Sequence, residues 1–532
     1  MKKYQESNRR YFVGALFSVL ISTVFAVVLQ FFKGDVLDYA AAGEVQMTIR
    51  YAGLLIGFIL CECLFCFLYD GLSAKFVTGC TRELKQDIFE SIVKRGYVAY
   101  KKQPQGEYIA KYTNEADMIK NRRFSMLPMF FEIFFKIVFV SVALFLLDWR
   151  IAIITIVLLT TPLYIPKLIE KRLQNAQDAY IEAVEENLAK VNDWLSGFEI
   201  IKNFSIEQKI VGRFKTVNDN TMEKMLKDTQ LGNVSRLITT LISYLSYFIV
   251  LACATWLVLK GDFTAGDFFV AIGMIDQLSY PLISLAGITR QLIAIKPACA
   301  EMEEFLNVPE ITQNKNIIES LNNDIRFENV SFSYDGQRSV LNKFNLTICK
   351  GKRYLLKGPS GCGKTTAINL LLKYYNVTNG NIKIDGKTLD QIGNTYGLMT
   401  VVRQEATLFH DTLRNNLTMY QDVLDSKLFE VLKSVGLDRY ANKQALDGVI
   451  TESGANFSGG EKKRICLARA LLRETDVLIL DEPLANLDDA TAERIEDLLL
   501  SIKDKTVLVV SHQFSLDKLS AFDEVVDFSI YQ

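Results

Sequence analysis

A glycine-rich segment at residues 358–366 has the residue types and the spacing of a phosphate-binding loop. The segment GPSGCGKTT follows the strand-like RYLLK and precedes the helix-like AINLLLKYY. Its glycines let backbone N–H groups approach phosphate oxygens closely, and the N-terminus of the following helix adds a favourable dipole. We expect the Lys364 ammonium to reach the β- and γ-phosphates of a nucleotide and the Thr365 hydroxyl to bind Mg²⁺. The nucleotide-contacting residues predicted in this loop are Gly358, Pro359, Ser360, Gly361, Cys362, Gly363, Lys364, Thr365 and Thr366.

Two carboxylates follow an apolar strand later in the chain. The run VLIL at residues 477–480 is typical of a parallel strand that is buried on both faces, and Asp481 and Glu482 follow it directly. Asp481 can hold Mg²⁺ through water, and Glu482 can orient or deprotonate an attacking water molecule. Because phosphoryl transfer depends mostly on positioning and charge stabilisation, one such carboxylate is enough for hydrolysis.

One of the two histidines of the chain ends another predicted strand. The segment Thr506–Val510 is followed by Ser511 and His512. A lone histidine is more often a hydrogen-bonded structural residue, but the carboxyl end of a strand in an α/β sheet is where ligands bind. We therefore count His512 among the candidate catalytic residues. Strands alternate with helices from about Ile325 onwards, which predicts an α/β nucleotide-binding domain at residues 325–532.

Residues 1–300 hold almost all of the long apolar runs. Over the whole chain 49% of residues are hydrophobic, and the mean hydropathy is +0.15. A run of about 20 apolar residues matches the bilayer core, and soluble proteins rarely carry several of them. The sequence predicts an all-α transmembrane domain at 1–300 and a linker at 301–324. The six expected spans are Tyr11–Phe32, Tyr51–Tyr69, Met126–Leu147, Ile151–Ile169, Leu237–Leu259 and Phe268–Ile288.

The connections between these spans set the topology. The second-to-third and fourth-to-fifth connections are long and helix-like, and the first of them is rich in Lys and Arg, which marks the cytoplasmic side. Both termini and the α/β domain are therefore expected inside the cell. We expect the helices to extend into the cytosol and to turn back near 106–121 and 197–207. Frequent Lys, Asn and Ile indicate an AT-rich bacterial genome, so the expected location is the plasma membrane.

Charged residues inside spans are candidates for function because they are expensive to bury in lipid. Glu132 and Lys136 lie four residues apart on one helical face, where they could pair. Glu62 lies near the middle of the second span, and Asp276 and Arg290 flank Pro281 in the sixth. These groups could line a path for cargo, or could face a water-filled vestibule and neutralise one another. The net charge of −1 argues against nucleic acid as a partner.

The nine cysteines do not predict a disulfide framework, because the thiols of a cytosolic domain stay reduced. Cys61, Cys63 and Cys66 lie close together in an apolar run. They could bind a soft metal ion. We favour the simpler interpretation that they are small apolar residues on a buried helix.

The segment FSGGE at residues 457–461 resembles the LSGGQ signature of ATP-binding cassette (ABC) proteins, and it precedes the carboxylate strand as it does in that family. The segments around the predicted cytoplasmic turns and the sixth span are similar to those of exporter-type half-transporters. The resemblance therefore covers nearly the whole chain. It implies the ABC exporter fold, a six-helix membrane domain fused to a P-loop ATPase. The signature residues that it implies as ATP contacts are Ser458, Gly459, Gly460 and Glu461.

The same resemblance assigns roles to residues outside the loop. Tyr334 is similar to the aromatic residue that stacks on adenine, and Gln404 to the residue that links Mg²⁺ to the membrane domain. Asp488 lies in a segment similar to the D-loop, and His512 is similar to the switch histidine that contacts the γ-phosphate. The implied catalytic set is Glu482, His512, Lys364 and Gln404, and the implied Mg²⁺ ligands are Thr365, Gln404 and Asp481.

The resemblance also implies an activity and a partner. In this family one subunit's signature contacts ATP held by the other subunit's loop, so a second identical or homologous half-transporter is expected. ATP hydrolysis would drive export of a small amphipathic substrate across the bilayer by alternating access. Uptake of a metal chelate, as in a few exporter-shaped members, and an ATP-gated channel or sensor remain alternatives.

Three residues depart from the family pattern. Phe457 replaces Leu, Glu461 replaces Gln, and Arg403 stands where Pro usually precedes the Q-loop glutamine. We expect Glu461 to place extra negative charge near the partner's nucleotide. None of the three departures removes a catalytic group.

Overall fold

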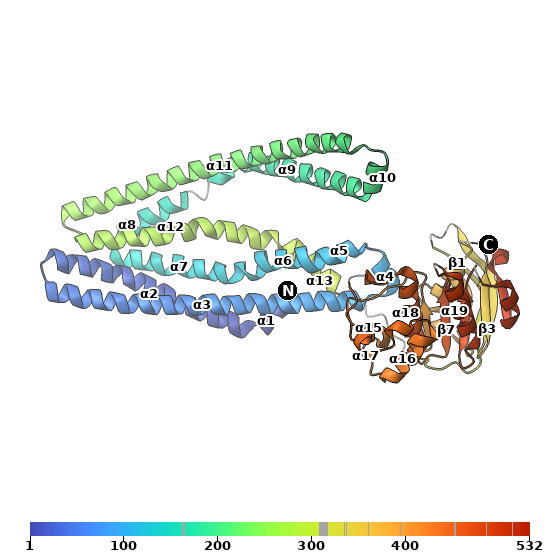
Figure 1. The fold of residues 1–532 in the computed structure, drawn as a ribbon. Helices are drawn as coiled ribbons and strands as arrows, with labels where there is room; N and C mark the ends of the chain where they lie inside the picture. The colour runs from blue at the N-terminus through green and yellow to red at the C-terminus, as the bar shows by residue number, and fades with distance from the viewer. Residues whose placement is uncertain are drawn as a thin grey trace. The chain divides into compact units, whose positions relative to one another are not determined.

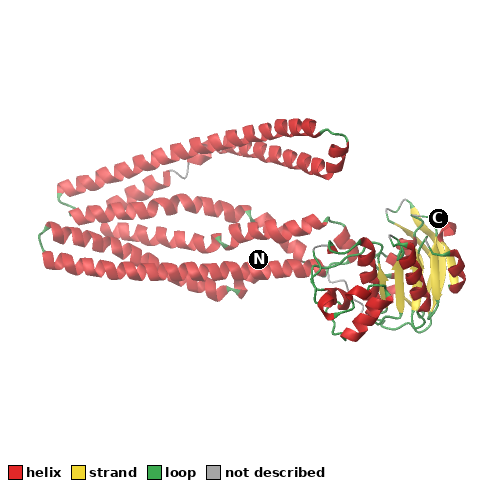
Figure 2. Cartoon of the chain, in the orientation of Figure 1, coloured by secondary structure: helices red, strands yellow, loops and turns green. Residues whose placement is uncertain are grey.

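The computed structural model describes residues 1–161, 165–307, 318–334, 336, 338–359, 361–393, 395–451, 454–485, 487–512 and 514–531. The chain divides into two compact units, Met1–Val93 with Pro104–Val308 and Lys94–Gln103 with Pro309–Gln532. Figure 2 shows that the first unit is helical and that the second combines strands with helices. The predicted fold class, a helical membrane domain with an α/β domain, is confirmed.

Long helices build the first unit. Its helices are α1 (Lys2–Ser7), α2 (Arg9–Ala41), α3 (Val45–Val93), α5 (Gln105–Ala110), α6 (Ala116–Ile119), α7 (Met126–Leu147), α8 (Trp149–Thr160), α9 (Ile165–Ser196), α10 (Phe198–Asn203), α11 (Glu207–Lys260), α12 (Ala265–Ala294) and α13 (Lys296–Leu306). Two short π-helical turns, Lys111–Glu115 and Lys120–Phe124, join α5, α6 and α7.

Five of these helical stretches are long and apolar enough to cross a membrane. They are Arg9–Ala41, Val45–Val93, Gln105–Leu147, Glu207–Lys260 and Ala265–Leu306, and they contain the first, second, third, fifth and sixth predicted spans. The fourth predicted span runs across residues 162–164, which lie outside the described residues. Its first part is α8, a shorter apolar helix.

Of the two turns that the sequence predicts on the cytoplasmic side, one is confirmed and one is wrong. α9 and α11 run side by side and are joined by α10, as Figure 1 shows, so the turn predicted at 197–207 is confirmed. The turn predicted at 106–121 is wrong, because that segment is helical and the chain turns at 94–104 instead. A short helix, α4 (Tyr97–Lys101), lies between Gly96 and Pro104. Proline favours the start of a helix and disfavours its interior, which explains why α5 begins directly after Pro104.

The segment Lys94–Gln103 groups with the second unit and not with the helices that flank it. The Tyr97 ring stacks on the Tyr374 ring with their centroids 3.9 Å apart. The guanidinium of Arg403 lies 5.6 Å from the centre of the same Tyr374 ring. The turn between the second and third spans is therefore packed against the α/β unit next to Gln404.

Two glycines allow α2 and α12 to approach closely. A Cβ atom on Gly266 would lie 2.4 Å from both the Gly34 carbonyl oxygen and Asp38 Oδ2. The Gly266 N–H donates to Asp38 Oδ1 (2.7 Å), and the Thr264 hydroxyl donates to Asp38 Oδ2 (2.6 Å). Small residues are typical of such contacts between membrane helices, because packing and hydrogen bonds replace the hydrophobic effect there.

Of the predictions about charged residues and cysteines in the spans, one is confirmed and one is wrong. Lys136 Nζ donates to Glu132 Oε1 at 2.7 Å, so the predicted pair is confirmed. Cys63 and Cys66 are exposed on α3, so their predicted burial is wrong. An apolar side chain on a spanning helix needs no protein neighbour, because lipid is as apolar as the side chain. Among the described residues, no cluster of three or more His, Cys, Asp or Glu side chains could hold a metal ion.

Two sheets form the second unit. The antiparallel sheet has the order β2 (Ser339–Cys349), β1 (Asp324–Ser333), β4 (Asn379–Ile384) and β5 (Lys387–Thr388). The parallel sheet has the order β6 (Met399–Val402), β7 (Val477–Asp481), β8 (Thr506–Val510), β3 (Arg353–Lys357) and β9 (Glu524–Asp527). Every residue of β7 and β8 is buried, which agrees with their apolar runs.

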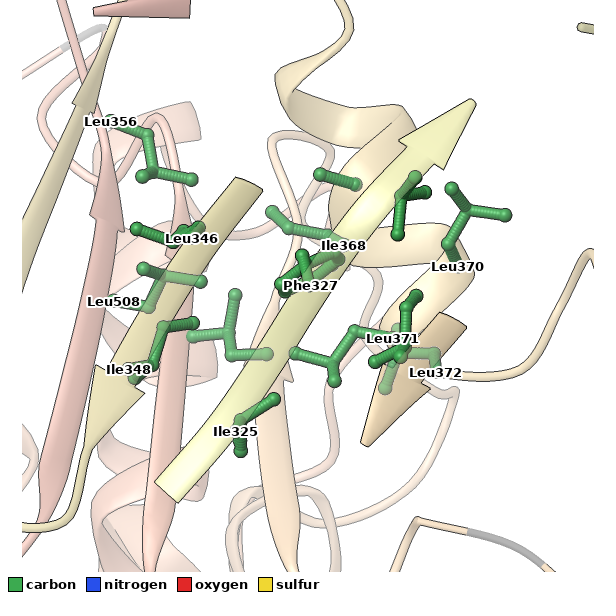
Figure 3. Packing of buried hydrophobic residues seen from close by; sticks show 14 of the residues in the cluster. Ile325, Phe327, Leu346, Ile348, Leu356, Ile368, Leu370, Leu371, Leu372 and Leu508 are labelled. Carbon is green, nitrogen blue, oxygen red and sulfur yellow. The ribbon is translucent and has the colours of Figure 1, made fainter. Parts of the chain in front are cut away.

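One core joins the two sheets through helix α14 (Lys364–Leu371). Figure 3 shows Phe327 of β1 beside Ile368 of α14, with Leu508 of β8 in the same cluster. Each fully buried side chain of this size contributes about 1.5–3 kcal/mol of hydrophobic stabilisation. The packing fixes the start of α14 against the carboxyl ends of the parallel strands, where the candidate site lies.

The remaining α-helices of this unit follow α14 in the sequence. They are α15 (Leu413–Thr418), α16 (Asp425–Ser434), α17 (Lys443–Leu446), α18 (Gly459–Leu472) and α19 (Asp489–Ser501), with a 3₁₀ turn, η5, at Asp438–Tyr440.

Candidate nucleotide site

The glycine-rich loop connects β3 to α14 as the sequence predicts. Gly358, Gly361 and Gly363 have φ values of 143°, 84° and 96°, a range that favours glycine. A Cβ atom on Gly363 would lie 2.7 Å from Leu341 Cδ2 and 3.0 Å from the Val340 oxygen, so a side chain there would displace the loop. Ser360 lies outside the described residues. The loop leaves backbone N–H groups at the start of α14, where an anion is favoured.

The Lys364 ammonium crosses the loop. The residue is only 7% exposed, and Nζ donates to the backbone oxygens of Gly358 (2.7 Å) and Pro359 (2.9 Å). His512 Nε2 lies 3.3 Å from the same nitrogen. The cation is therefore held at the centre of the loop, where phosphate oxygens can compete for it.

The two predicted metal ligands that flank the loop are brought together. Thr365 Oγ1 donates to Asp481 Oδ2 at 3.3 Å, although 116 residues separate them. Burial raises the pKa of the Asp481 carboxyl, while the Arg403 and Lys364 charges and the Thr365 bond oppose that shift. A hydroxyl and a carboxylate are hard oxygen donors of the kind that Mg²⁺ prefers, so the residues present fit this ion. Gln404 lines a cavity together with Thr365 and Asp481.

Glu482 has an unusual backbone conformation. Its φ is 52°, which is uncommon for a residue with a side chain and occurs often at functional sites. The Glu482 N–H donates to the Val510 oxygen (2.8 Å), and the Lys463 ammonium donates to the Glu482 oxygen (2.9 Å). These two bonds hold the residue on both sides. Its Oε1 lies 3.4 Å from His512 Nε2, so the two predicted catalytic groups are neighbours.

Lys463 is a site residue that the sequence analysis missed. It is 7% exposed on α18, and burial lowers the pKa of its ammonium, although the nearby Glu482 and Asp481 carboxylates oppose that shift. No motif identifies it. Its position two residues after the signature is the only signal in the sequence, and the contact itself is long-range.

Tyr334 stands at the edge of the site. Its hydroxyl and the Thr366 hydroxyl share a hydrogen bond of 3.0 Å. The ring centroids of Phe332 and Tyr375 lie 4.8 and 5.1 Å from the Tyr334 ring centroid, and both rings are nearly perpendicular to the Tyr334 ring. The residue is 52% exposed. A ring that these contacts hold in place and that remains half exposed can stack against a planar base.

These residues surround one cavity of 540 Å³. That volume lies within the usual range of small-molecule sites. The cavity is lined by Tyr334, Val340, Gly361, Gly363, Lys364, Thr365, Thr366, Gln404, Asp481, Glu482, Ala485, Val510 and His512.

The signature residues are not among those that line this cavity in the part of the chain that the structure describes. Ser458 caps α18 through a reciprocal pair of bonds with Glu461. A Cβ atom on Gly459 would meet nothing within 4 Å, so the helix start is open there. Asp488 caps α19 by accepting the Thr491 N–H (3.0 Å). Most of the predicted site residues therefore form two groups in one chain, those at the cavity and those of the signature, whereas Asp488 lies at the start of α19 and belongs to neither group.

Comparisons with known proteins agree with this geometry. Residues 11–282 match the family model described as ABC transporter transmembrane region, and residues 341–485 match the family model described as ABC transporter. An ATP-dependent lipid A-core flippase of Haemophilus ducreyi is 28% identical over 442 residues, which cover 81% of this chain and 76% of the flippase. The multidrug resistance-like ATP-binding protein MdlB of Buchnera aphidicola is 27% identical and covers 87% of this chain and 81% of its own length.

A solved structure has the same fold. A bacterial Atm1-family ABC exporter with ATP bound superposes with a TM-score of 0.79 at 22% identity, covering 98% of this chain and 93% of the exporter. The membrane-region match covers more than half of the chain, and the ATPase match contains the loop and both carboxylates. The chain is therefore a member of the ABC transporter family, a membrane protein that joins the transporter's membrane region to the domain that binds and hydrolyses ATP.

Proposed function

We propose that this chain pairs with a second half-transporter and uses ATP hydrolysis in two shared sites to export an amphipathic substrate. The observation that carries the proposal is the division of the site residues into two groups. Lys364, Glu482 and His512 lie around one cavity, whereas the signature at Ser458 lies outside it. A second chain would bring its signature to this cavity and receive the first chain's signature at its own.

The loop residues would bind the nucleotide. The Lys364 ammonium exchanges its two backbone acceptors for phosphate oxygens, and the backbone N–H groups at the start of α14 bind the remaining phosphate charge. Tyr334 stacks on the adenine. Thr365, Asp481 and Gln404 would hold Mg²⁺, which neutralises charge on the β- and γ-phosphates when it is bound.

Glu482 and His512 would act on the attacking water. The Glu482 carboxylate accepts a hydrogen bond from a water molecule in line with the γ-phosphate and takes its proton as the new P–O bond forms. His512 lies within 3.4 Å of that carboxylate and 3.3 Å of Lys364 Nζ, so it can hold the carboxylate and contact the γ-phosphate. The leaving group is the diphosphate oxygen of ADP.

The membrane region would convert this cycle into transport. Closure of the two ATPase domains on ATP pulls the cytoplasmic helix turns together and opens a path between the spans towards the outside. Hydrolysis returns the spans to their first arrangement. The segment 94–103, which is packed on Tyr374 beside Gln404, supports this route from the nucleotide to the membrane helices. We place the chain in the plasma membrane, with the ATPase domain in the cytoplasm.

The names of the relatives support an amphipathic cargo. They include a lipid A-core flippase, a multidrug resistance-like ATP-binding protein and a lactococcin-G-processing and transport ATP-binding protein. Glu132 is neutralised by Lys136, so the acidic residues of the spans that favour cationic members of this class are Glu62 and Asp276.

The test is transport in everted membrane vesicles, which expose the ATPase domain to added ATP. We expect ATP-dependent accumulation of a cationic amphipathic dye or a fluorescent lipid inside wild-type vesicles and none in Glu482→Gln vesicles. Efflux from preloaded vesicles would indicate uptake as the cellular direction. Passive conductance on ATP binding without hydrolysis would indicate a channel. Either result would refute export.

A further inference from the structure

The turn η5 lies against the signature at both positions where the signature departs from its family. Phe457 and Glu461 replace the usual Leu and Gln. The Tyr440 ring packs on the Phe457 ring with centroids 5.2 Å apart, and the Tyr440 hydroxyl donates to Glu461 Oε1 at 3.0 Å. One side chain therefore contacts both exceptional residues.

Arg439 completes the contact. Its Nη2 forms an ion pair with Glu461 Oε1, and its guanidinium lies 4.7 Å from the centre of the Tyr440 ring. The Glu461 carboxylate is 10% exposed, whereas the Arg439 side chain is 68% exposed. The acidic group is thus covered, and its positive partner faces outwards at the same end of α18.

The second carboxylate oxygen of Glu461 closes the helix cap. Oε2 accepts the Ser458 N–H at 2.9 Å, and Ser458 Oγ accepts the Glu461 N–H at 3.3 Å. Burial alone would raise the pKa of Glu461, but the bonds from Ser458 and Tyr440 and the Arg439 charge outweigh it and hold the pKa below its ordinary value. The carboxylate is therefore ionised and fully bonded, and the expectation of free negative charge towards a partner's nucleotide is not met in this structure.

We propose that Arg439 and Tyr440 are positioning residues for the divergent signature: they neutralise Glu461 and fix the start of α18, so that Ser458 and the glycines can bind a partner's ATP. This inference rests on the proposed pairing of two half-transporters. A signature with Leu and Gln would need neither residue, because it carries no charge to compensate and no ring to pack. The role is thus specific to the FSGGE sequence.

The mechanism is electrostatic as well as mechanical. The polyphosphate of ATP carries several negative charges, and a carboxylate at the start of α18 would oppose the favourable helix dipole there. The Arg439 guanidinium cancels that charge. Its loss leaves a buried, unpaired carboxylate beside the position of the γ-phosphate, and added salt would screen part of the resulting repulsion.

The test is a double-mutant cycle on the full-length transporter, assembled with its partner subunit if it has a different one. Arg439→Ala and Tyr440→Phe are each made in the native sequence and in a Phe457→Leu/Glu461→Gln background. In the native sequence, Arg439→Ala is expected to lower the ATPase kcat about tenfold, with partial recovery at higher salt. In the second background the same change is expected to alter kcat less than about twofold, because the charge that it compensates is gone.

Two controls separate this role from general destabilisation. Lys427→Ala removes an exposed ion pair with Glu474 elsewhere in the same unit and is expected to leave kcat unchanged. Binding of trinitrophenyl-ATP is expected to be unchanged in Arg439→Ala, because each chain's own loop is intact. A variant that fails to fold would lose this binding as well, and the rescue in the second background would then decide the matter.

Two results would overturn the proposal. Equal losses of kcat on Arg439→Ala in both backgrounds would show that the residue does not act through Glu461, and no loss in the native sequence would show that the pair is unimportant. Failure of the proposed pairing and hydrolysis, on which this inference rests, looks different, since the wild-type transporter would then show no ATPase activity that Glu482→Gln abolishes.

Discussion

Replacing Lys364 with alanine is expected to weaken ATP binding far more than it weakens the fold. The ammonium is almost fully buried and donates two short bonds to the backbone oxygens of Gly358 and Pro359. Phosphate oxygens would replace these neutral acceptors when ATP binds, and the bonds become charge-assisted at both ends. The free energy that Lys364 contributes to ATP binding is therefore the difference between its bonds to phosphate oxygens and its bonds to backbone oxygens.

The magnitude follows from that difference. A hydrogen bond with one charged partner contributes about 1.5–3 kcal/mol, and one in which both partners are charged contributes more. Allowing for the two lost backbone bonds, we expect a net loss of about 3 kcal/mol in binding, which raises the Kd for ATP about 150-fold. In the absence of ATP the variant removes the Lys364 bond from the Gly358 oxygen, whereas the Pro359 oxygen still accepts the Cys362 N–H at 3.3 Å, and a buried charge is removed as well, so the loss of stability is expected to be only about 1 kcal/mol.

The assay is an equilibrium titration with trinitrophenyl-ATP, with thermal unfolding of the same samples. Lys350→Ala is the matched control, because Lys350 is an exposed lysine in the turn before β3. An Lys364→Ala variant that binds within about threefold of the wild type would refute the assignment. A variant that loses binding only because it unfolds would show a large fall in Tm, which the structure does not predict.

Two further predictions concern stability. The Asp385 carboxylate accepts the backbone N–H groups of Asn322, Asn323 and Asp324 at 2.8, 2.6 and 3.2 Å. Burial raises the pKa of Asp385, but these bonds outweigh it and hold it below its ordinary value. Asp385→Asn is therefore expected to lower stability by about 1–2 kcal/mol in denaturant unfolding at neutral pH. The pKa of Asp385 is lower in the folded protein than in the unfolded chain, so the stability difference between the wild type and the variant should be complete above about pH 4. It should shrink as the pH falls through the pKa of the folded state, and a stability difference that does not change with pH would contradict this. Gly266→Val would push a side chain into the Gly34 backbone and should lower the stability of the detergent-purified protein by about 1–3 kcal/mol. Gly57→Val is its control, because a Cβ atom there meets nothing within 4 Å, and equal effects of the two changes would refute the packing argument.

Much of the candidate nucleotide site could be predicted from sequence because each part is local. The glycine-rich loop and the two carboxylates each follow a recognisable apolar strand, and the carboxyl ends of neighbouring parallel strands meet at one edge of a sheet. The structure pairs β7 with β8 and β8 with β3, which brings Lys364, Asp481 and His512 to that edge. Five of the six predicted spans could also be identified from sequence, since length and hydropathy suffice, whereas the fourth crosses residues 162–164, which lie outside the described residues.

The two missed contacts have the same physical origin. Lys463 reaches Glu482 across 19 residues, and Arg439 reaches Glu461 across 22, so neither contact leaves a periodic signal in the sequence. The misplaced first turn has a different cause. The segment 106–121 is similar to a family region associated with coupling, but its backbone is helical, and the actual turn is set by Gly96 and Pro104. Gly96 and Pro104 are local signals in the sequence that place this turn, whereas the contacts of Lys463 and Arg439 depend on tertiary packing.

The most direct test of the account is ATP turnover by Glu482→Gln in the reconstituted transporter. The substitution keeps the shape of the side chain and removes the base that lies 3.4 Å from His512. We expect ATP to bind with an unchanged Kd while kcat falls by about a hundredfold to a thousandfold. Hydrolysis at the wild-type rate by this variant would contradict the central claim that the cavity at the carboxyl ends of β3, β7 and β8 is the ATPase site.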